Sequence, residues 1–324
     1  MKNKVLTISI AAFNVEKYIR NTLESLIVSD NFDELEVLII NDGSTDSTSS
    51  VAAEYVRRYP NVFKLINKEN GGYGSTINTA VKVASGRYFK QLDGDDWFDT
   101  DNLSEFIIFL KLNDADCIYS PYWKVYQNSE ERQLYTPDSI KKDTIDAKDI
   151  AMHALTFKTR IFTDNNISIT KKCFYTDCEY NVKPLFFTNT IDYFNKPVYC
   201  YRLDLVGQSV SREGWKKHYC EHNKVTLELM SYYENNIGKR SVLYETAIED
   251  YILGVYKTNL YIALELADKG IQEEYRKLDL DIKTKHPMFF KKKNMKMHIL
   301  AKSGYKFWCI TRVFHGLFEK NIII

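Results

Sequence analysis

Residues 35–59, LEVLIINDGSTDSTSSVAAEYVRRY, contain the pattern that decides the fold. Apart from Glu36, the first six residues form an apolar run, which is typical of a β-strand buried on both faces. The last twelve, from Thr48, place apolar side chains at helical spacing. The polar stretch NDGSTDS, residues 41–47, separates the two. The segment therefore predicts a buried strand, a polar turn and a helix.

The same unit recurs on both sides of this stretch. Further strands are expected at 5–13, 62–67 and 86–92, and helices at 16–28 and 75–84. This alternation predicts an α/β fold, a mostly parallel sheet with helices on both faces. Farther along we expect a helix at 101–113, a strand at 116–127, a loop at 128–148, helices at 147–157 and 176–187, and a strand at 193–203. The predicted domains are 1–220, with halves 1–100 and 101–220, and a helical C-terminal region, 221–324.

Composition excludes several classes of protein. The 324 residues contain 44 Lys and Arg against 43 Asp and Glu, so bulk charge favours neither a nucleic acid nor a membrane surface as a partner. The six cysteines are scattered and form no CxxC pair, which indicates reduced thiols rather than disulfides or a zinc site. The apolar run at 5–13 is too short to span a membrane, and we interpret it as the first strand of a cytoplasmic protein.

The polar and glycine-rich segments all follow predicted strands. They comprise residues 13–14, 41–47, 67–74 and 93–99. In a parallel sheet the carboxyl ends of the strands meet at one edge, where ligands bind. The sequence therefore predicts a ligand site at this edge.

The segment DGDDWFD, residues 93–99, carries candidate metal ligands. In an extended chain Asp93 and Asp95 face one side and Asp96 turns away. Carboxylates in this arrangement suit a hard divalent cation such as Mg²⁺ or Mn²⁺. An EF-hand loop is excluded, because Phe98 and Ser104 stand where that loop requires Gly and Glu. The simpler interpretation is an acidic turn that caps the next helix.

Two further segments of the edge suggest contact with a nucleotide. Asp42 directly follows a buried strand, and its carboxylate could accept a hydrogen bond from a ring N–H such as that of uracil, or serve only the turn. The motif ENGGYGSTIN, residues 69–78, matches neither the GxGxxG fingerprint nor a phosphate-binding P-loop. Its glycines still permit close approach of a ligand to the backbone.

Four motifs in register, ISIAAFN, VLIINDGSTDST, ENGGYGSTIN and ASGRYFKQLDGDDWF, resemble the family 2 glycosyltransferases, which have the GT-A fold. The resemblance covers about the first 100 residues and extends more weakly to about residue 212. It implies transfer of a sugar, with inversion, from a nucleotide-sugar donor that is usually a UDP-sugar. Two positions depart from the family pattern: Ala11 replaces the usual proline, and Ile77 replaces a frequent arginine.

The resemblance also implies roles for individual residues. Asp42 would contact the uracil, Asp93 would lie near the ribose, and Asp95 would bind the Mn²⁺ or Mg²⁺ that bridges the diphosphate. Asp96 would orient the donor sugar. The remaining implied donor-site residues are Ala12, Phe13, Asn14, Asn70, Gly71, Gly72 and Asn78.

Inversion requires a general base on the face of the sugar opposite the leaving group. In FYTDCEYNVKPLFF, residues 174–187, Asp177 stands where the family places its base, and Glu179 is the fallback. The structural alternative is that Asp177 merely sits in the first turn of a helix, beside its dipole.

Less specific signals follow. Gln208 and Ser209 resemble a loop that closes over the diphosphate, although a solvated loop fits equally well. His218 is a candidate metal ligand, with His222 as the alternative, and a structural role is the competing interpretation.

The basic and aromatic stretch 291–318 suggests either an amphipathic membrane anchor or a surface that packs on the catalytic domain or on a second subunit of a homodimer.

The expected protein is therefore a metal-dependent hexosyl- or N-acetylhexosaminyltransferase. It would act on a glycan or lipid-linked acceptor in bacterial cell-surface polysaccharide synthesis, in the cytoplasm or at the inner face of the membrane. A catalytically silent nucleotide- or glycan-binding partner in an assembly complex is the alternative. A sugar nucleotidyltransferase is disfavoured, because the glycine-rich N-terminal loop with Arg and Lys is missing.

Overall fold

The computed structural model describes residues 4–129, 131–137, 144–205, 211–238, 242–306 and 308. The chain divides into two compact units, residues 1–205 and 206–324, whereas the boundary expected at residue 220 falls inside helix α7 (Arg212–Asn236). Gln208 and Ser209, and residues 307 and 309–318 of the C-terminal stretch, lie outside the described residues.

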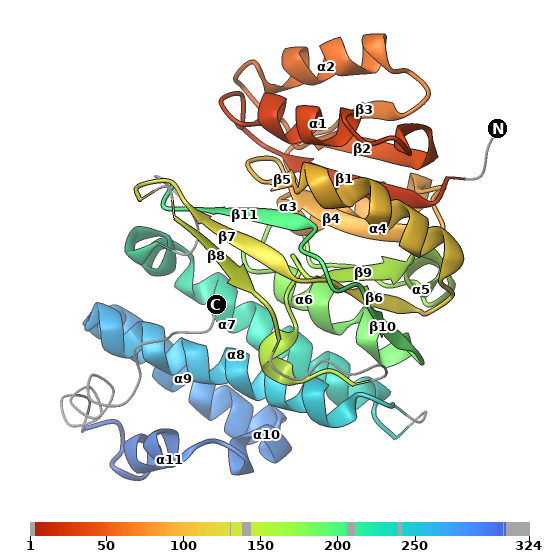
Figure 1. The fold of residues 1–324 in the computed structure, drawn as a ribbon. Helices are drawn as coiled ribbons and strands as arrows, with labels where there is room; N and C mark the ends of the chain where they lie inside the picture. The colour runs from red at the N-terminus through yellow and green to blue at the C-terminus, as the bar shows by residue number, and fades with distance from the viewer. Residues whose placement is uncertain are drawn as a thin grey trace. The chain divides into compact units, whose positions relative to one another are not determined.

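Unit 1 is built on a seven-stranded sheet in the order β10-β6-β9-β4-β1-β2-β3 (Figure 1). Its strands are β1 (Leu6–Ala12), β2 (Leu35–Asn41), β3 (Phe63–Asn67), β4 (Tyr88–Asp93), β6 (Cys117–Tyr119), β9 (Leu155–Lys158) and β10 (Ile191–Tyr193). The strands β4, β1, β2 and β3 are parallel, and β9 runs antiparallel between β4 and β6. Every residue of β2 is buried, which confirms the two-sided burial expected from its apolar run.

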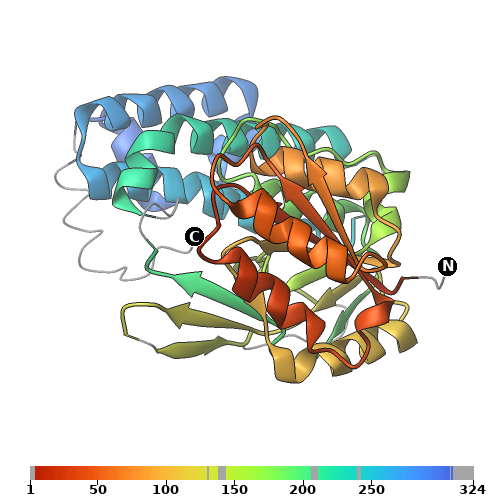
Figure 2. The same cartoon turned by 90° about the horizontal axis from the view of Figure 1, so that it is seen from above.

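Helices cover both faces of this sheet (Figures 1 and 2). Helix α1 (Ile19–Ile27) contacts α2 (Thr48–Arg58) and α4 (Thr100–Leu112), while α3 (Tyr73–Val83) contacts α5 (Thr159–Asp164). The shorter helical elements are η1 (Phe32–Glu34), η2 (Ala147–Asp149), α6 (Asp177–Val182) and η3 (Pro184–Phe187). The predicted α/β fold is thus confirmed.

A second, four-stranded sheet of unit 1 has the order β5-β11-β7-β8. Its strands are β5 (Trp97–Phe98), β11 (Tyr199–Leu203), β7 (Tyr122–Tyr126) and β8 (Arg132–Tyr135). The strand expected at 116–127 is interrupted at residues 120–121, and its halves, β6 and β7, belong to different sheets. The strand expected at 193–203 is likewise divided between β10 and β11, which belong to different sheets. The segment expected to be a loop at 128–148 contains β8.

The helix predicted at 147–157 is wrong. That segment is the short η2 followed by β9, in which Phe157 pairs with Phe89 of β4 and with Cys117 of β6. Two neighbouring strands satisfy the backbone groups of β9, so tertiary pairing outweighs the local helical spacing.

The strand register brings three loop segments together. Ala12 of β1 is level with Asn41 of β2, and Ala11 is level with Asp93 of β4. The carboxyl ends of β1, β2 and β4 therefore coincide, which places the segments that begin at Phe13, Asp42 and Gly94 at one edge of the sheet.

Unit 2 is helical, as predicted. Its helices α7, α8 (Glu245–Leu266) and α9 (Lys269–Lys285) contact one another pairwise, α10 (Pro287–Lys291) packs on α9, and α11 (Met295–Lys302) follows. A buried ion pair joins Lys293 to Asp279 at 3.0 Å, and Tyr256 also donates to this carboxylate. Among the described residues, we find no helix that combines the length and apolar character needed to cross a membrane.

The buried His222 makes the stability of unit 2 depend on pH. Its Nδ1 lies 2.9 Å from Oδ1 of Asn259, and burial lowers its pKa to about 4. A depressed histidine pKa means that the unfolded chain binds a proton first, so stability is complete above the unfolded pKa of about 6.5 and falls as pH decreases towards 4. The free energy of unfolding of unit 2 should fall by about 2 kcal/mol between pH 6.5 and 5.

Denaturant titration of the wild type and of His222→Asn at both pH values tests this prediction. The change in the free energy of unfolding between the two pH values is compared in the two proteins. The difference between these changes is the contribution of residue 222, because contributions from other groups cancel. Asn259→Ala serves as a control, because it weakens the same contact and keeps the histidine. An equal loss of stability with pH in the wild type and in His222→Asn would contradict the prediction.

Candidate acidic active site

The loop after β4 is fixed against the end of β1. The backbone N–H of Gly94 donates to the carbonyl of Ala11 at 3.0 Å. The hydroxyl of Thr22 donates to the carbonyls of Gly94 at 2.9 Å and of Asp96 at 2.6 Å. A Cβ at position 94 would lie only 2.8 Å from the carbonyl oxygen of Ala11, so the close approach requires glycine here.

The carboxylates of this loop do not alternate as an extended chain would. Residues 93–96 form a turn in which the N–H of Asp96 donates to the carbonyl of Asp93 at 3.1 Å. This turn brings Asp96 back towards Asp93, so the expectation that Asp96 points away is wrong. Asp93 accepts a hydrogen bond from the hydroxyl of Tyr73 at 2.7 Å, and Asp96 accepts one from the hydroxyl of Tyr199 at 2.5 Å.

The acidic cluster, defined here as Asp93, Asp95, Asp96 and Asp177, is electrostatically strained. Burial, together with the charge of Asp95, raises the pKa of Asp93 to about 7. Burial also raises the pKa of Asp95, of Asp177 and, most strongly, of Asp96. Carboxylates that repel one another in a poorly solvated place favour a bound cation, because its positive charge offsets their repulsion.

His153, which lies two residues before β9, is close to two members of this cluster. The side-chain ligand atoms of Asp93, Asp96 and His153 all lie within 4.8 Å of one another. The His153 ring stacks on Tyr201 with centroids 4.0 Å apart, and burial lowers its pKa to about 3, so the imidazole is neutral. Its Nδ1 is buried and has no hydrogen-bond partner among the described residues. A neutral imidazole nitrogen beside two carboxylates is a donor set that fits Mn²⁺ or a similar divalent ion.

His153→Phe should weaken Mn²⁺ binding by about 10- to 100-fold, because one ligand is lost while the aromatic stack is kept. Titration of Mn²⁺ followed by electron paramagnetic resonance measures this directly. His298→Phe, in unit 2, is the control and should bind Mn²⁺ as the wild type does. An unchanged dissociation constant for His153→Phe would exclude His153 as a ligand.

Asp42 is anchored by the loop that follows β3. Its Oδ1 accepts from the ammonium of Lys68 at 2.5 Å and from the N–H of Gly71 at 3.0 Å. Its Oδ2 accepts from the N–H of Gly72 at 2.8 Å. Gly72 has a φ of +78°, a conformation that L side chains rarely adopt, and it is the N-cap residue of α3. The carboxylate thus holds the glycine-rich loop in place.

The other residues expected around the base connect neighbouring loops. Asn14, with φ +53°, accepts from the N–H of Thr45 at 2.9 Å, and Phe13 beside it is 49% exposed. Ala12 is buried and Asn70 is exposed. Both amide atoms of Asn78 bond to the backbone of Ile169, at 2.7 and 2.8 Å. Ligand contacts by these residues remain predictions.

Asp177 is the first residue of α6 and is half-buried. The segment before it docks on the glycine-rich loop, because the N–H of Lys172 donates to the carbonyl of Gly71 at 2.6 Å. The negative charge of Asp177 contributes to the raised pKa of Asp93, so the two lie near one another. Glu179, the fallback base, is fully buried and paired with Lys183 at 2.7 Å. Glu179 is thus already engaged in a buried ion pair, and the role of Asp177 as the base remains a prediction.

Five residues of this site were missed by the sequence interpretation: Lys68, Tyr73, His153, Tyr199 and Arg202. Tyr73 belongs to the glycine-rich motif and Lys68 directly precedes it. Their position after β3, at the predicted ligand edge, could have indicated them. The other three come from β11 and from the segment that was expected to be helical, and no local pattern marks them.

The candidate histidine ligands lie in unit 2. His218, at a kink in α7, lies 2.6 Å from Oε1 of Glu221. The His222 ring bonds to Asn259, as described above. A metal-binding role for either remains a prediction.

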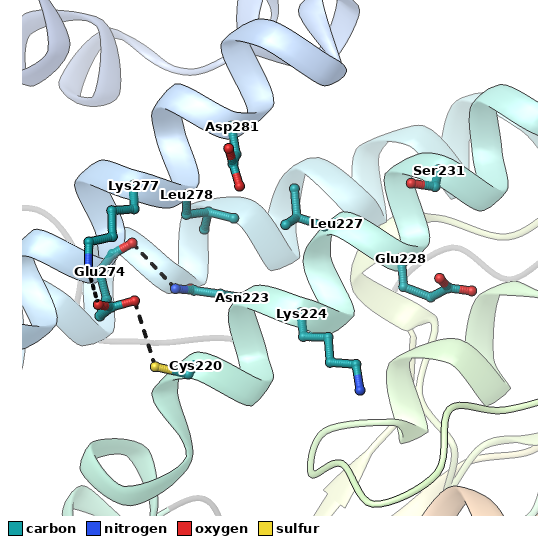
Figure 3. A pocket seen from close by; sticks show the side chains of 10 residues that line it. All are labelled: Cys220, Asn223, Lys224, Leu227, Glu228, Ser231, Glu274, Lys277, Leu278 and Asp281. Carbon is teal, nitrogen blue, oxygen red and sulfur yellow. Dashed lines mark hydrogen bonds and ion pairs between the residues drawn. The ribbon is translucent and has the colours of Figure 1, made fainter.

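Unit 2 also contains a groove of about 490 Å³ between α7 and α9 (Figure 3). Glu274 in this groove lies 2.7 Å from Lys277 and 3.8 Å from the thiol of Cys220. Its charges are partly paired, and it gathers no group of His, Cys, Asp or Glu able to hold a metal among the described residues. The acidic cluster of unit 1 is therefore the better candidate for chemistry.

Curated relatives match parts of the chain. "Putative glycosyltransferase EpsH" of Bacillus subtilis (strain 168) is 38% identical over 31% of this chain and 29% of its own length. "Glycosyltransferase GlyA" of Streptococcus pneumoniae is 25% identical over 61% of this chain and 30% of its own. "Chondroitin synthase" of Escherichia coli is 40% identical over 30% of this chain and 14% of its own. The matches thus span less than a third of each of these relatives.

Solved structures share the fold at low sequence identity. S. aureus TarS 1-349 in complex with UDP has a TM-score of 0.60 at 16% identity, over 93% of this chain and 92% of that chain. The mannosyltransferase PcManGT from Pyrobaculum calidifontis, in complex with GDP-Man and Mn²⁺, has a TM-score of 0.52 at 14% identity, over 98% and 88%.

The family described as "Glycosyl transferase family 2" matches residues 7–175, which include β1 except Leu6, the strands β2 to β4 and the DGDD loop. The match covers more than half of the chain and coincides with the acidic edge of the sheet. The chain belongs to glycosyl transferase family 2.

Proposed function

We propose that this protein is an inverting, metal-dependent glycosyltransferase that moves a sugar from a UDP-sugar to a hydroxyl of a glycan or lipid-linked acceptor. The observation that carries the proposal is the acidic cluster, four carboxylates with raised pKa values, two of which, Asp93 and Asp96, have ligand atoms within 4.8 Å of those of His153. Such a cluster suits a cation and, through it, a diphosphate.

The proposed roles combine the family resemblance with the positions of the described side chains. Asp42 would accept the ring N–H of uracil, in competition with its present donors. The cation would be held either by Asp95, with His218 as the added ligand, or by Asp93, Asp96 and His153. When bound, it would neutralise the charge of the departing diphosphate. The diphosphate contacts of Gln208 and Ser209 belong to the same proposal.

Asp177 would act as the general base. Its carboxylate would take the proton from the acceptor hydroxyl as that oxygen attacks the anomeric carbon. Burial raises the pKa of Asp177, which makes its carboxylate a stronger base than that of an ordinary aspartate. Asp96, which accepts hydrogen bonds from Tyr199 and from the N–H of Arg202 at 2.7 Å, would orient the donor sugar.

The setting is proposed from the relatives. A chondroitin synthase and Eps proteins point to the synthesis of bacterial polysaccharide, and TarS has been solved with UDP-GlcNAc, which supports a hexosyl or N-acetylhexosaminyl donor. Action in the cytoplasm, at the inner face of the membrane, is part of this proposal, as is the choice between membrane association and a homodimer for the stretch 291–318.

Calorimetric titration of UDP into the purified protein, with Mn²⁺ and with chelator, tests the proposal. We expect binding that requires the metal and that is lost in Asp95→Asn. Asp101→Asn, an exposed aspartate of α4, is the matched control. Absence of UDP binding under every condition would refute the uridine assignment.

The rival function is a catalytically silent partner that binds nucleotide or glycan in an assembly complex. Release of UDP from a panel of UDP-sugars separates the two, because a silent partner binds without turnover. The presence of Asp177, a candidate base, within the acidic cluster supports the enzyme.

A further inference from the structure

The end of unit 2 is unusually basic. Residues 282–306 contain eight lysines and no aspartate or glutamate, although the whole chain is nearly neutral. Helices α10 and α11 lie within this stretch (Figure 1). A cationic segment of this kind has its counter-charges outside itself, either elsewhere in the fold or on a partner.

Helix α11 presents apolar side chains to solvent. Met295 is 74% exposed and Ile299 is 47% exposed. With Lys302, which is also exposed, they are spaced at i, i+4 and i+7 and so share one face of the helix. The opposite face buries Met297 and Leu300, at 2% and 0% exposure, in the unit. The helix is therefore packed on one side and leaves an apolar strip on the other.

The five lysines of this region outside residues 283–285 and position 296 fall into two groups. Lys293 is buried on Asp279, and Lys292 pairs with Glu249, so these two serve the fold. Lys291, Lys302 and Lys306 are exposed and form no ion pair with any residue that the structure describes. Lys302 shares the helical face of Met295 and Ile299, and Lys291 and Lys306 lie four residues before and four residues after α11 in the sequence.

We propose that this face of α10–α11, defined by Lys291, Met295, Ile299, Lys302 and Lys306, docks on an anionic lipid surface. Anionic headgroups complement the lysines, and the apolar pair can enter the boundary of the acyl chains. A second copy of the chain fits less well, because a stable dimer buries about 800 Å² on each partner and two side chains supply far less. Like charges on two copies would also repel. The proposal does not depend on the nucleotide donor.

Co-sedimentation of the full chain with vesicles tests the proposal. We use phosphatidylcholine vesicles with about 30% phosphatidylglycerol, and pure phosphatidylcholine vesicles, over a salt series. Binding should require the anionic lipid and weaken with salt. Lys291→Gln/Lys302→Gln/Lys306→Gln should lower the affinity by about 100-fold, and Met295→Ser/Ile299→Ser by about 10-fold.

Matched controls come from α4 and from exposed lysines outside α10 and α11. Ile108 and Leu112 on α4 are 46% and 83% exposed at the same i, i+4 spacing, so Ile108→Ser/Leu112→Ser removes an equivalent apolar pair. Lys17→Gln/Lys82→Gln/Lys269→Gln removes the same charge from other exposed positions. Both controls should bind as the wild type does, and thermal unfolding verifies that every variant is folded.

Three results would overturn the proposal. The first is equal binding to anionic and neutral vesicles, or no binding to either. The second is an effect of the control variants equal to that of the α10–α11 variants. The third is a dimer, seen by analytical ultracentrifugation, that Met295→Ser/Ile299→Ser dissociates while vesicle binding is absent, since this face would then join two copies. An α10–α11 variant that loses vesicle binding but still binds UDP shows that the membrane proposal can be tested separately from the catalytic proposal.

Discussion

Asp177→Asn should lower the rate of sugar transfer by about 10³-fold, because an amide cannot take the proton of the acceptor hydroxyl. UDP binding in the presence of Mn²⁺ should remain within about twofold of the wild type, since the substitution leaves the other acidic side chains in place. Initial rates with a UDP-sugar that the wild type turns over, together with calorimetry of UDP, measure both quantities. The loss should therefore appear in kcat rather than in donor affinity.

The pH profile gives a second and independent readout. A general base acts only when ionised, so the rate should rise with pH through a pKa above the ordinary aspartate range, as the burial of Asp177 requires. In Asp177→Asn this rising limb should be absent from the residual rate. Glu179→Gln is the control, although it disturbs the buried pair with Lys183. A larger catalytic loss in Glu179→Gln than in Asp177→Asn, with both proteins folded, would reverse the assignment.

The position of Asp177 shows how far the sequence could lead. Strand and helix periodicity predicted the sheet β1 to β4, and the rule that ligands bind at the carboxyl ends predicted its edge. Asp42 and Asp93 follow directly from that rule, since each ends or follows a buried strand. Asp177 lies more than 80 residues beyond Asp93, and only the resemblance to a family related the two positions.

The remainder of the site depends on contacts that local patterns do not encode. His153 precedes a strand that exists because β4 and β6 pair with it, and the same residues alone favour a helix. The convergence of Asp96 on Asp93 depends on a turn held by Thr22, which lies in α1. Long-range hydrogen bonds of this kind are invisible in a single sequence, so the cluster of Asp93, Asp96 and His153 could not be predicted.

Arg202 illustrates the same limit and leads to the second large prediction. Its Nε donates to the carbonyl of Asp95 at 2.6 Å, and its Nη2 donates to Oδ1 of Asn21 at 2.8 Å. The guanidinium also lies over Trp97, 4.4 Å from the ring centroid. One side chain on β11 thus fixes the acidic loop to α1, and its charge offsets the burial that raises the pKa of Asp95. Arg202 is a positioning residue, because it acts through Asp95.

Arg202→Met should lower kcat/KM by about 10²- to 10³-fold, because about 3–4 kcal/mol of charge-assisted hydrogen bonding no longer holds the loop. The affinity for Mn²⁺ should fall in parallel, which a purely structural role elsewhere in the fold would not produce. Arg202→Lys separates charge from geometry: a single ammonium keeps the charge near Asp95 but cannot make both bonds of the planar guanidinium. If geometry dominates, the lysine variant stays close to Arg202→Met in Mn²⁺ affinity.

Arg20 provides the matched control for this experiment. It pairs with Glu54 and lies over Tyr55, as Arg202 lies over Trp97. Arg20 is half-exposed, and its side-chain hydrogen bond goes to Glu54 rather than to the acidic loop. Arg20→Met should change kcat/KM and Mn²⁺ affinity by less than about twofold, since exposed pairs contribute little. Equal effects of the two substitutions on Mn²⁺ affinity, or a fall in thermal stability of Arg202→Met with unchanged Mn²⁺ affinity, would show that Arg202 stabilises the fold without positioning Asp95. The comparison therefore tests whether β11, which no motif marks, is part of the catalytic apparatus.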